Sequence, residues 1–258
     1  MRTVEKALML LQHFDEHNCE FSLTRLAELS GYDKATTLRM LRALAKFDFV
    51  ERNAATKAYR LGPGVLHLAR VREASTPLLE VTMPLLQDLH ERSGLETAHL
   101  ALLSGGRLTT QGVIEGQYAN RISFAIGEAS TLHASATGIV TLAHLPEAEL
   151  AKLLPKQLPS LTEHTPTSQA ELMKLFVQSK SAGYYINKEL NELGCCSVAS
   201  PLIDHTGWAI GAYAIALPLL RMTPAKQDAC VAAVIDIARQ ASILLGAQFV
   251  ETPVAVKL

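Results

Sequence analysis

Two adjacent thiols, Cys195 and Cys196, are the residues of this sequence best suited to nucleophilic chemistry. A cysteine nucleophile works with a nearby base, and His99, His133 or His205 could supply one. No acidic residue stands at a spacing that would orient such a histidine, and the two thiols begin an expected strand. Buried, unreactive thiols are therefore the better interpretation of the pair. A thiol-dependent enzyme that uses Cys195 or Cys196 remains the alternative hypothesis.

Other catalytic and metal-binding patterns are weak or absent from the sequence. Glu189 and Glu192 lie three residues apart, which suits solvated or pocket-rim charges better than an acid–base pair. His13 and His17 share one face of a helix, but no third metal ligand lies near them. The chain contains no GxSxG, P-loop, HExxH or GxGxxG motif. We therefore expect no enzymatic activity, no cofactor and no metal ion.

A second kind of chemistry is indicated by basic residues that gather near the N-terminus. Residues 22–62 hold eight basic and four acidic side chains, a net charge of +4. The whole chain, with 24 basic and 25 acidic residues, has a formal net charge of −1. A basic segment on a mildly acidic body is typical of a DNA-binding module joined to a second domain.

The elements that would position these charges follow the order of a winged helix-turn-helix. Apolar residues at helical spacing predict an amphipathic helix within residues 4–14. Ser22 is a suitable N-cap for a short helix over residues 23–30, which Gly31 ends, and a further helix is expected over residues 33–47. Residues 49–52 and 58–61 predict two short strands around a polar turn, the wing of the motif.

The helix expected over residues 33–47 has an apolar face and a polar face. At about 100° per residue, the face that packs on the preceding helices comprises Leu38, Leu41, Leu44 and Ala45. The opposite face carries Ala35, Thr36, Arg39, Ala43 and Lys46, with Arg42 on its flank, while Lys34 points inward. Small residues beside Arg39 would let the helix enter the major groove, where an arginine pairs with a guanine edge or a phosphate.

We predict DNA contacts from this helix, from the helix before it and from the wing. Thr36 and Thr37 at the helix start are placed to donate to a phosphate, aided by the helix N-terminus. The full set of predicted DNA-binding residues is Arg25, Lys34, Thr36, Thr37, Arg39, Arg42, Lys46, Arg52, Lys57 and Arg60.

The rest of the chain alternates predicted helices and strands. Helices are expected at 65–75, 85–93, 132–144, 147–154, 168–182 and 224–249, and strands at 97–103, 107–115, 121–126, 184–187, 196–204 and 208–217. This mixture predicts an α+β domain on a largely antiparallel sheet. We divide the chain into a winged helix-turn-helix domain (residues 1–62), a linker helix (63–76) and an effector-binding domain (77–253).

Four motifs in order resemble the IclR family of bacterial transcriptional regulators. They are LTRLAELSGYDKATTLRMLRAL (23–44), YRLG (59–62), LHASATG (132–138) and SVASPLID (197–204). The resemblance covers nearly the whole chain. It implies an N-terminal winged helix-turn-helix and a C-terminal GAF/profilin-like α/β effector-binding domain with a mostly antiparallel sheet. It also implies a repressor or activator that binds double-stranded DNA as a homodimer, often as a dimer of dimers.

The resemblance further implies that a small organic acid or aromatic effector binds in the C-terminal domain. The positions that match the family's pocket are Ala136, Thr137, Asn187, Ser197, Ala214 and Ala216. Acid-binding members often have serines where this chain has Ala214 and Ala216, so fewer donors remain for a carboxylate. We therefore hypothesise a larger and more apolar effector such as an aromatic acid. The alternatives are a short keto acid, or alanines that merely pack a strand.

Composition and charge fit this interpretation. The chain is 48% hydrophobic and 19% charged, which is typical of a packed globular protein. No apolar run reaches the roughly 18 residues of a membrane span, and the N-terminus lacks a signal-peptide layout. We expect a cytoplasmic protein without membrane contact. Because one recognition helix reads few base pairs, we also expect a dimer on a palindromic operator.

Overall fold

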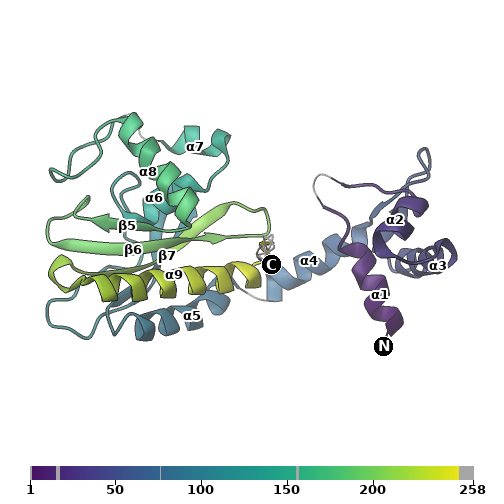
Figure 1. The fold of residues 1–258 in the computed structure, drawn as a ribbon, viewed down its shortest axis with the longest axis horizontal. Helices are drawn as coiled ribbons and strands as arrows, with labels where there is room; N and C mark the ends of the chain where they lie inside the picture. The colour runs from purple at the N-terminus through teal and green to yellow at the C-terminus, as the bar shows by residue number, and fades with distance from the viewer. Residues whose placement is uncertain (1, 16–17, 76, 155–156, 250–258) are drawn as a thin grey trace, which may run out of the picture. The chain divides into compact units, whose positions relative to one another are not determined.

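The computed structural model describes residues 2–15, 18–75, 77–154 and 157–249. The chain divides into two units, Met1–Pro77 and Leu78–Leu258, each of which is described by itself (Figure 1). Position 76 of the predicted linker helix and positions 250–253 of the predicted effector-binding domain lie outside the described residues.

The first unit is a three-helix motif followed by a hairpin and a further helix. Its elements are α1 (Arg2–Leu11), α2 (Leu23–Ser30), α3 (Lys34–Ala45), β1 (Val50–Arg52), β2 (Tyr59–Leu61) and α4 (Pro63–Ser75). The two strands pair antiparallel, with Val50 opposite Leu61. A small core joins the helices to the hairpin through Leu10, Leu26, Met40, Leu41, Val50 and Tyr59.

Local capping fixes the turn between α2 and α3. The Ser22 side chain accepts a hydrogen bond from the Arg25 backbone at the start of α2. Gly31 ends α2 in the left-handed region at φ 71°, where a residue with a Cβ atom is strained. The Asp33 side chain then accepts from the Thr36 N–H at 2.8 Å and begins α3. The predicted helix-turn-helix is therefore observed, and the bounds of α2 agree to the residue.

The second unit is a five-stranded antiparallel sheet in the order β4-β3-β7-β6-β5 with helices on both faces. The strands are β3 (Thr97–Ser104), β4 (Arg107–Ile114), β5 (Tyr185–Lys188), β6 (Cys195–Ile203) and β7 (Ala209–Pro218). The helices are α5 (Leu78–Arg92), α6 (Ala136–Ala143), α7 (Glu147–Leu153), α8 (Gln169–Ala182), the 3₁₀ turn η1 (Leu219–Arg221) and α9 (Pro224–Leu244). This arrangement confirms the predicted α+β class and the antiparallel sheet.

Alternation along β7 shows how the sheet forms two cores. Tyr213 and Ile215 lie in the core shared with α5 and α9, whereas Ala212 and Ala214 lie in the core shared with α6 and α8. Figure 1 shows α5 and α9 side by side on one face of the sheet and α6 and α8 on the other. Successive side chains of a strand point to opposite faces, and alanines on the second face let α6 approach closely.

Three sequence predictions on this unit are wrong. Residues 121–126 form a loop rather than a strand, and β4 is bonded instead to the residues that follow, through the bridge between Thr109 and Ala129 and the bond from the Thr110 N–H to the Glu128 carbonyl. Helix α5 begins at Leu78 and passes through Pro84, because tertiary contacts such as the 2.8 Å bond from the Tyr213 hydroxyl to the Thr82 carbonyl hold its first turns. Helix α9 ends at Leu244, several residues before the predicted end.

Candidate DNA-binding surface and effector pocket

Helix α3 exposes one cationic face. Its buried residues are Thr37, Met40 and Leu41, which pack inside the first unit. The outer side forms an open groove lined by Ala35, Leu38, Arg39, Arg42, Ala43 and Lys46. Because two of these side chains are alanines, the helix backbone lies close to the surface between three cations. That is the shape and charge needed by a helix that enters a DNA groove.

The cations on this face are not neutralised by nearby acids. Within the part of the chain that the structure describes, no ion pair involves Lys34, Arg39, Arg42 or Lys46. All four residues are exposed. Free cations attract the phosphates of DNA and release counterions when they bind. The surface of α3 therefore keeps its full positive charge for a ligand.

The predicted arginine contacts outside α3 have protein partners already. Arg25 lies 3.4 Å from Glu28, and Arg60 lies 2.5 Å from Glu51 and 3.6 Å from Glu20. In the wing, the Arg52 Nε atom donates to the backbone carbonyl of Lys57. Lys57 itself is exposed. Exposed ion pairs contribute roughly 0–1 kcal/mol, so a phosphate can replace the carboxylate partner of either arginine.

Two predictions on the start of α3 need correction. Thr37 is fully buried, and its hydroxyl donates to the Asp33 carbonyl at 3.0 Å, so this side chain does not reach the surface. Thr37 precedes Leu41 by four residues and shares its inward face. Lys34 is exposed rather than inward-pointing, since the helix begins at this residue and its first turn is open to solvent. Thr36 is half-buried.

The second unit contains a cavity of about 140 Å³ at the start of α6. Four of the predicted effector-binding residues line it: Ala136, Thr137, Asn187 and Ser197. The first two belong to the opening turn of α6, where Ser135 caps the helix by accepting from the Gly138 N–H at 3.0 Å. The N–H groups of that turn carry the positive end of the helix dipole toward the cavity.

Asn187 holds the wall of the cavity together. Its Nδ2 atom donates to the Ala134 carbonyl at 2.8 Å, and its Oδ1 atom accepts from the Leu190 N–H at 2.9 Å. These bonds join the segment before α6 to the loop after β5. Thr137 is also engaged, since its hydroxyl lies 3.3 Å from that of Ser135. Because Ser135 donates to the Thr131 carbonyl at 2.7 Å, the Thr137 hydroxyl is the donor of this pair.

Ala214 and Ala216 do not line the cavity, which corrects their predicted place in the site. Both are 0% exposed within β7. Ala214 pairs with His99 of β3 and Ala199 of β6, in the core beneath α6. The structure agrees with the alternative interpretation, in which the two alanines pack within a strand.

Sequence reasoning missed the part of the cavity that comes from β3, β4 and the loops. These lining residues are His99, Thr110, Ile122, Ser123, Phe124, Glu128, Ala129, Ser130, Ser135, Asn191, Glu192 and Cys195. Glu128 and Glu192 are exposed, whereas His99 is buried. No lysine or arginine is among the described residues that line the cavity. From the sequence, His99 and Cys195 are considered only as parts of a possible thiol–base pair, and not as effector-binding residues.

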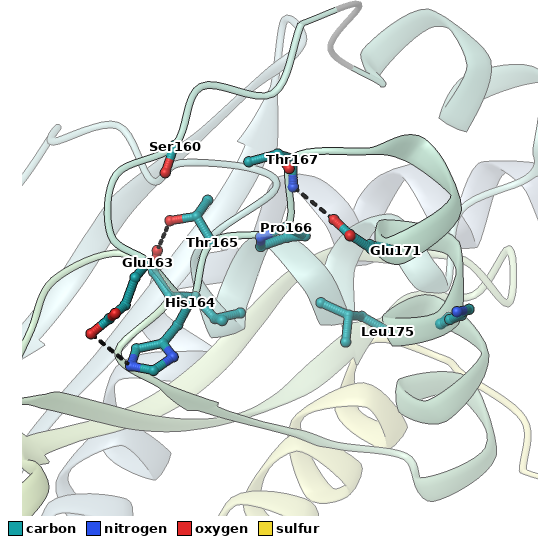
Figure 2. A pocket seen from close by; sticks show the side chains of 10 residues that line it. Ser160, Glu163, His164, Thr165, Pro166, Thr167, Glu171 and Leu175 are labelled. Atoms are coloured by element: carbon teal, nitrogen blue, oxygen red, sulfur yellow. Dashed lines mark hydrogen bonds and ion pairs between the residues drawn. The ribbon is translucent and has the colours of Figure 1, made fainter.

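A larger and more open hollow of about 460 Å³ lies at the start of α8 (Figure 2). Its polar groups already bind one another. The Thr165 hydroxyl donates to the Leu190 carbonyl at 2.6 Å, and the Thr167 N–H donates to Glu171 at 3.0 Å. His164 lies 3.5 Å from Glu189 and 3.8 Å from Glu163. We therefore regard the smaller and more enclosed cavity at α6 as the effector-site candidate.

The thiols are poor nucleophiles in this structure. Burial, with a smaller effect of the Glu192 carboxylate, raises the pKa of Cys195 to about 11. Burial also raises the pKa of Cys196 to about 12. Within residues 2–15, 18–75, 77–154 and 157–249, no three His, Cys, Asp or Glu side chains are grouped so that they could hold a metal ion. No helix of the described residues has the length and hydropathy to cross a membrane.

Comparison with known proteins gives the family. Residues 3–54 match the IclR helix-turn-helix domain, and residues 73–243 match the bacterial transcriptional regulator IclR C-terminal domain. The chain belongs to the IclR family. The regulator XynR of Escherichia coli strain K12 is 31% identical over 95% of this chain and 96% of its own. IclR proteins are DNA-binding transcriptional regulators with a C-terminal effector domain, as the sequence predicted.

Solved structures of IclR proteins agree with this assignment. The crystal structure of an IclR transcriptional regulator from a Silicibacter species is 32% identical, with a TM-score of 0.85 over 96% of this chain and 97% of that one. An IclR homologue of Microbacterium hydrocarbonoxydans, crystallised with 4-hydroxybenzoate, shares the fold at 20% identity. Its TM-score is 0.59 over 95% of this chain and all of that one.

Proposed function

We propose that this IclR regulator reads its operator with the exposed face of α3 and that Arg39 makes the central contact. The observation that carries this proposal is the unpaired cationic face, with Arg39 between Ala35 and Ala43. Arg42 and Lys46 flank Arg39 and suit phosphate contacts. Lys34, Thr36, Arg25 and the wing residues Arg52, Lys57 and Arg60 complete the proposed set.

The test is a gel shift of the full chain on the DNA upstream of its own gene. A base contact contributes about 1–3 kcal/mol, so Arg39→Ala should weaken binding by roughly 5- to 150-fold for each half-site. Arg92→Ala is the matched control, because Arg92 is half-exposed in the second unit and pairs with Asp88 and Asp236. Equal binding of Arg39→Ala and the control would overturn the assignment.

We also propose that the regulator binds a palindromic operator as a homodimer and that two dimers associate. Exposed apolar side chains support a partner on the first unit: Val4, Leu8 and Met9 of α1 are 64%, 53% and 53% exposed, and Leu66 of α4 is 65% exposed. Two recognition helices would then read half-sites about 34 Å apart. In the same gel shift, a probe with one half-site deleted should bind far more weakly than the full palindrome.

For the effector, we propose a small organic acid that binds in the cavity at the start of α6. Its acidic group would lie at the N–H groups of Ala136 and Thr137, because a helix N-terminus binds anions and no lysine or arginine lines the cavity. A cavity of about 140 Å³ is similar in size to one that holds a single benzene ring, so the ligand is small. The ligand alters DNA affinity by preferring one of two conformations.

Two classes of acid compete for this cavity. An aromatic acid is supported by the ring of Phe124 in the wall and by the homologue that holds 4-hydroxybenzoate. A short keto acid is supported by the small volume. Calorimetry with a panel of both separates them, since tight binding of glyoxylate or pyruvate alone would exclude the aromatic class. We further propose that the protein acts in the cytoplasm and catalyses no reaction, because its pocket thiol stays protonated.

A further inference from the structure

His99 is a polar residue buried in the wall of the effector cavity. It lies on β3 opposite Ala214, is 3% exposed and lines the cavity. Its ring stacks on that of Phe124 from the facing loop, with centroids 4.1 Å apart and planes 32° apart. The Nδ1 atom is buried and has no hydrogen-bond partner among the described residues. Of the three side-chain atoms in this condition, only His99 Nδ1 belongs to a residue of the cavity wall.

The neighbours of His99 show that this lack of a partner is local. The Thr97 hydroxyl, two residues earlier on β3, donates to the Ile122 carbonyl at 2.5 Å and accepts from the Gly116 N–H at 2.9 Å. Asn187 has a partner on each side of its amide. A buried polar atom without a partner destabilises a protein, and an apolar ring would fill the same place without this cost. Because the residue lines the cavity, a ligand there would supply the missing partner once a small shift of the ring opens the buried Nδ1 atom to it.

Charge restricts what that partner is. Burial lowers the pKa of His99 to about 4, so the ring is neutral at physiological pH. A neutral imidazole carries one N–H donor and one acceptor nitrogen, and it offers no ion pair to a carboxylate. The exposed carboxylates of Glu128 and Glu192 also line the cavity. An uncharged group is therefore favoured at His99, while the acidic end of the ligand keeps its proposed place at the N–H groups that begin α6.

A hydroxyl group is the uncharged partner that fits either tautomer of the ring. If Nδ1 carries the proton, it donates to the hydroxyl oxygen; if Nε2 carries it, Nδ1 accepts from the hydroxyl hydrogen. The stack with Phe124 fixes the plane of the imidazole and hence the direction of the bond. The loop that carries Phe124 is held on β4, where Thr110 donates to the Glu128 carbonyl at 2.9 Å.

We propose that His99 is a specificity-determining residue of the effector pocket and that the effector is a hydroxy acid, with its hydroxyl at Nδ1 of His99 and its acidic group at the start of α6. This inference rests on the proposed effector site. The cavity is small enough that one molecule of a few carbon atoms or a single ring contacts both places.

The experiment is calorimetry on the full chain with acids that differ by one hydroxyl. The probes are benzoate against 3- and 4-hydroxybenzoate, and propionate against lactate and 3-hydroxypropionate. At least one hydroxylated acid should bind the wild type about tenfold more tightly than its parent, the effect of one hydrogen bond of about 1.4 kcal/mol. His99→Phe keeps the ring beside Phe124 and should reduce this preference to about twofold or less. His99→Asn keeps a polar atom near the place of Nδ1 and should retain most of it.

Three results would overturn the inference. The first is that the wild type binds no hydroxylated acid more tightly than its parent acid. The second is that His99→Phe keeps the wild type's preference for a hydroxylated acid. The third is a large drop in the melting temperature of His99→Phe, which would show that His99 has a structural partner. A parent acid that binds and changes the gel shift as well as its hydroxylated form would leave the proposed effector site standing and exclude only the role of His99.

Discussion

Replacement of Gly138 by alanine tests the geometry of the effector pocket, because two effects of opposite sign compete there. Gly138 is buried in the first turn of α6, and a Cβ atom added to it would lie 2.4 Å from the Leu132 carbonyl oxygen and 2.7 Å from the Leu132 Cα atom. Both atoms are backbone and have little freedom to move. Alanine would by itself stabilise a helix by about 1 kcal/mol relative to glycine. Overpacking costs about 1–3 kcal/mol, and more when the backbone must shift.

We expect the steric effect to prevail and Gly138→Ala to lower the free energy of unfolding of the second unit by about 1–2 kcal/mol. For a unit of this size, that change lowers the melting temperature by roughly 2–8 °C. The displaced start of α6 should also weaken effector binding at Ala136 and Thr137. Scanning calorimetry measures the first effect and titration calorimetry the second, while DNA affinity without effector should stay unchanged.

The matched control is Gly112→Ala on β4. Its added Cβ atom would meet the Met83 sulfur at 2.6 Å and a Leu86 methyl at 3.1 Å, both of them side-chain atoms. Methionine adapts its rotamers easily, so we expect a change within about 1 kcal/mol of the wild type. If Gly138→Ala melts at a higher temperature than the wild type, helix propensity alone decides the outcome and the close approach to Leu132 is refuted.

Two further predictions concern buried ionisable groups. Burial of Glu96 acts to raise its pKa, but hydrogen bonds from Arg221 and Lys226 outweigh burial and hold the pKa below its ordinary value of 4.5. Glu96→Gln should therefore lower the free energy of unfolding by about 3 kcal/mol at pH 7. The difference should shrink as the pH falls below about 4.5, because protonation of Glu96 then removes the stabilising ion pairs from the wild type as well. Urea unfolding that shows an equal difference at pH 7 and pH 3 would contradict this prediction. Cys195, with a pKa of about 11, should react with iodoacetamide at pH 8 far more slowly than the exposed Cys19, because only the thiolate reacts. Peptide mass spectrometry follows both reactions. Rapid labelling of Cys195 would restore the thiol-enzyme hypothesis.

The sequence determined the helix-turn-helix because its signals are local. The caps at Ser22 and Asp33 and the left-handed Gly31 act over three or four residues, so α2 was predicted to the residue. The capping box of Ser168 and Glu171 at the start of α8 is a local signal of the same kind. The wheel of α3 placed Arg39 on the exposed face correctly. It failed at Lys34, where the first turn of the helix is open to solvent, and at Ala45, which is exposed near the end of the helix.

The effector pocket was decided by the tertiary structure. The family resemblance pointed to Ala136, Thr137, Asn187 and Ser197, and the fold brings these four residues to the wall of one cavity. The other side of the cavity comes from β3, β4 and the loop that was predicted as a strand, and none of these has a motif.

The pairing of strands distant in sequence determines which side chains of the sheet meet. The register of β3 and β7 sets His99 opposite Ala214, and helix α6 then covers the alanine while the histidine keeps a place in the cavity wall. A one-residue shift of that register would turn each side chain to the other face of the sheet. No local pattern in the sequence fixes such a register, because it depends on how both faces of the sheet are buried by helices, of which α6, α8 and α9 begin more than thirty residues after β3.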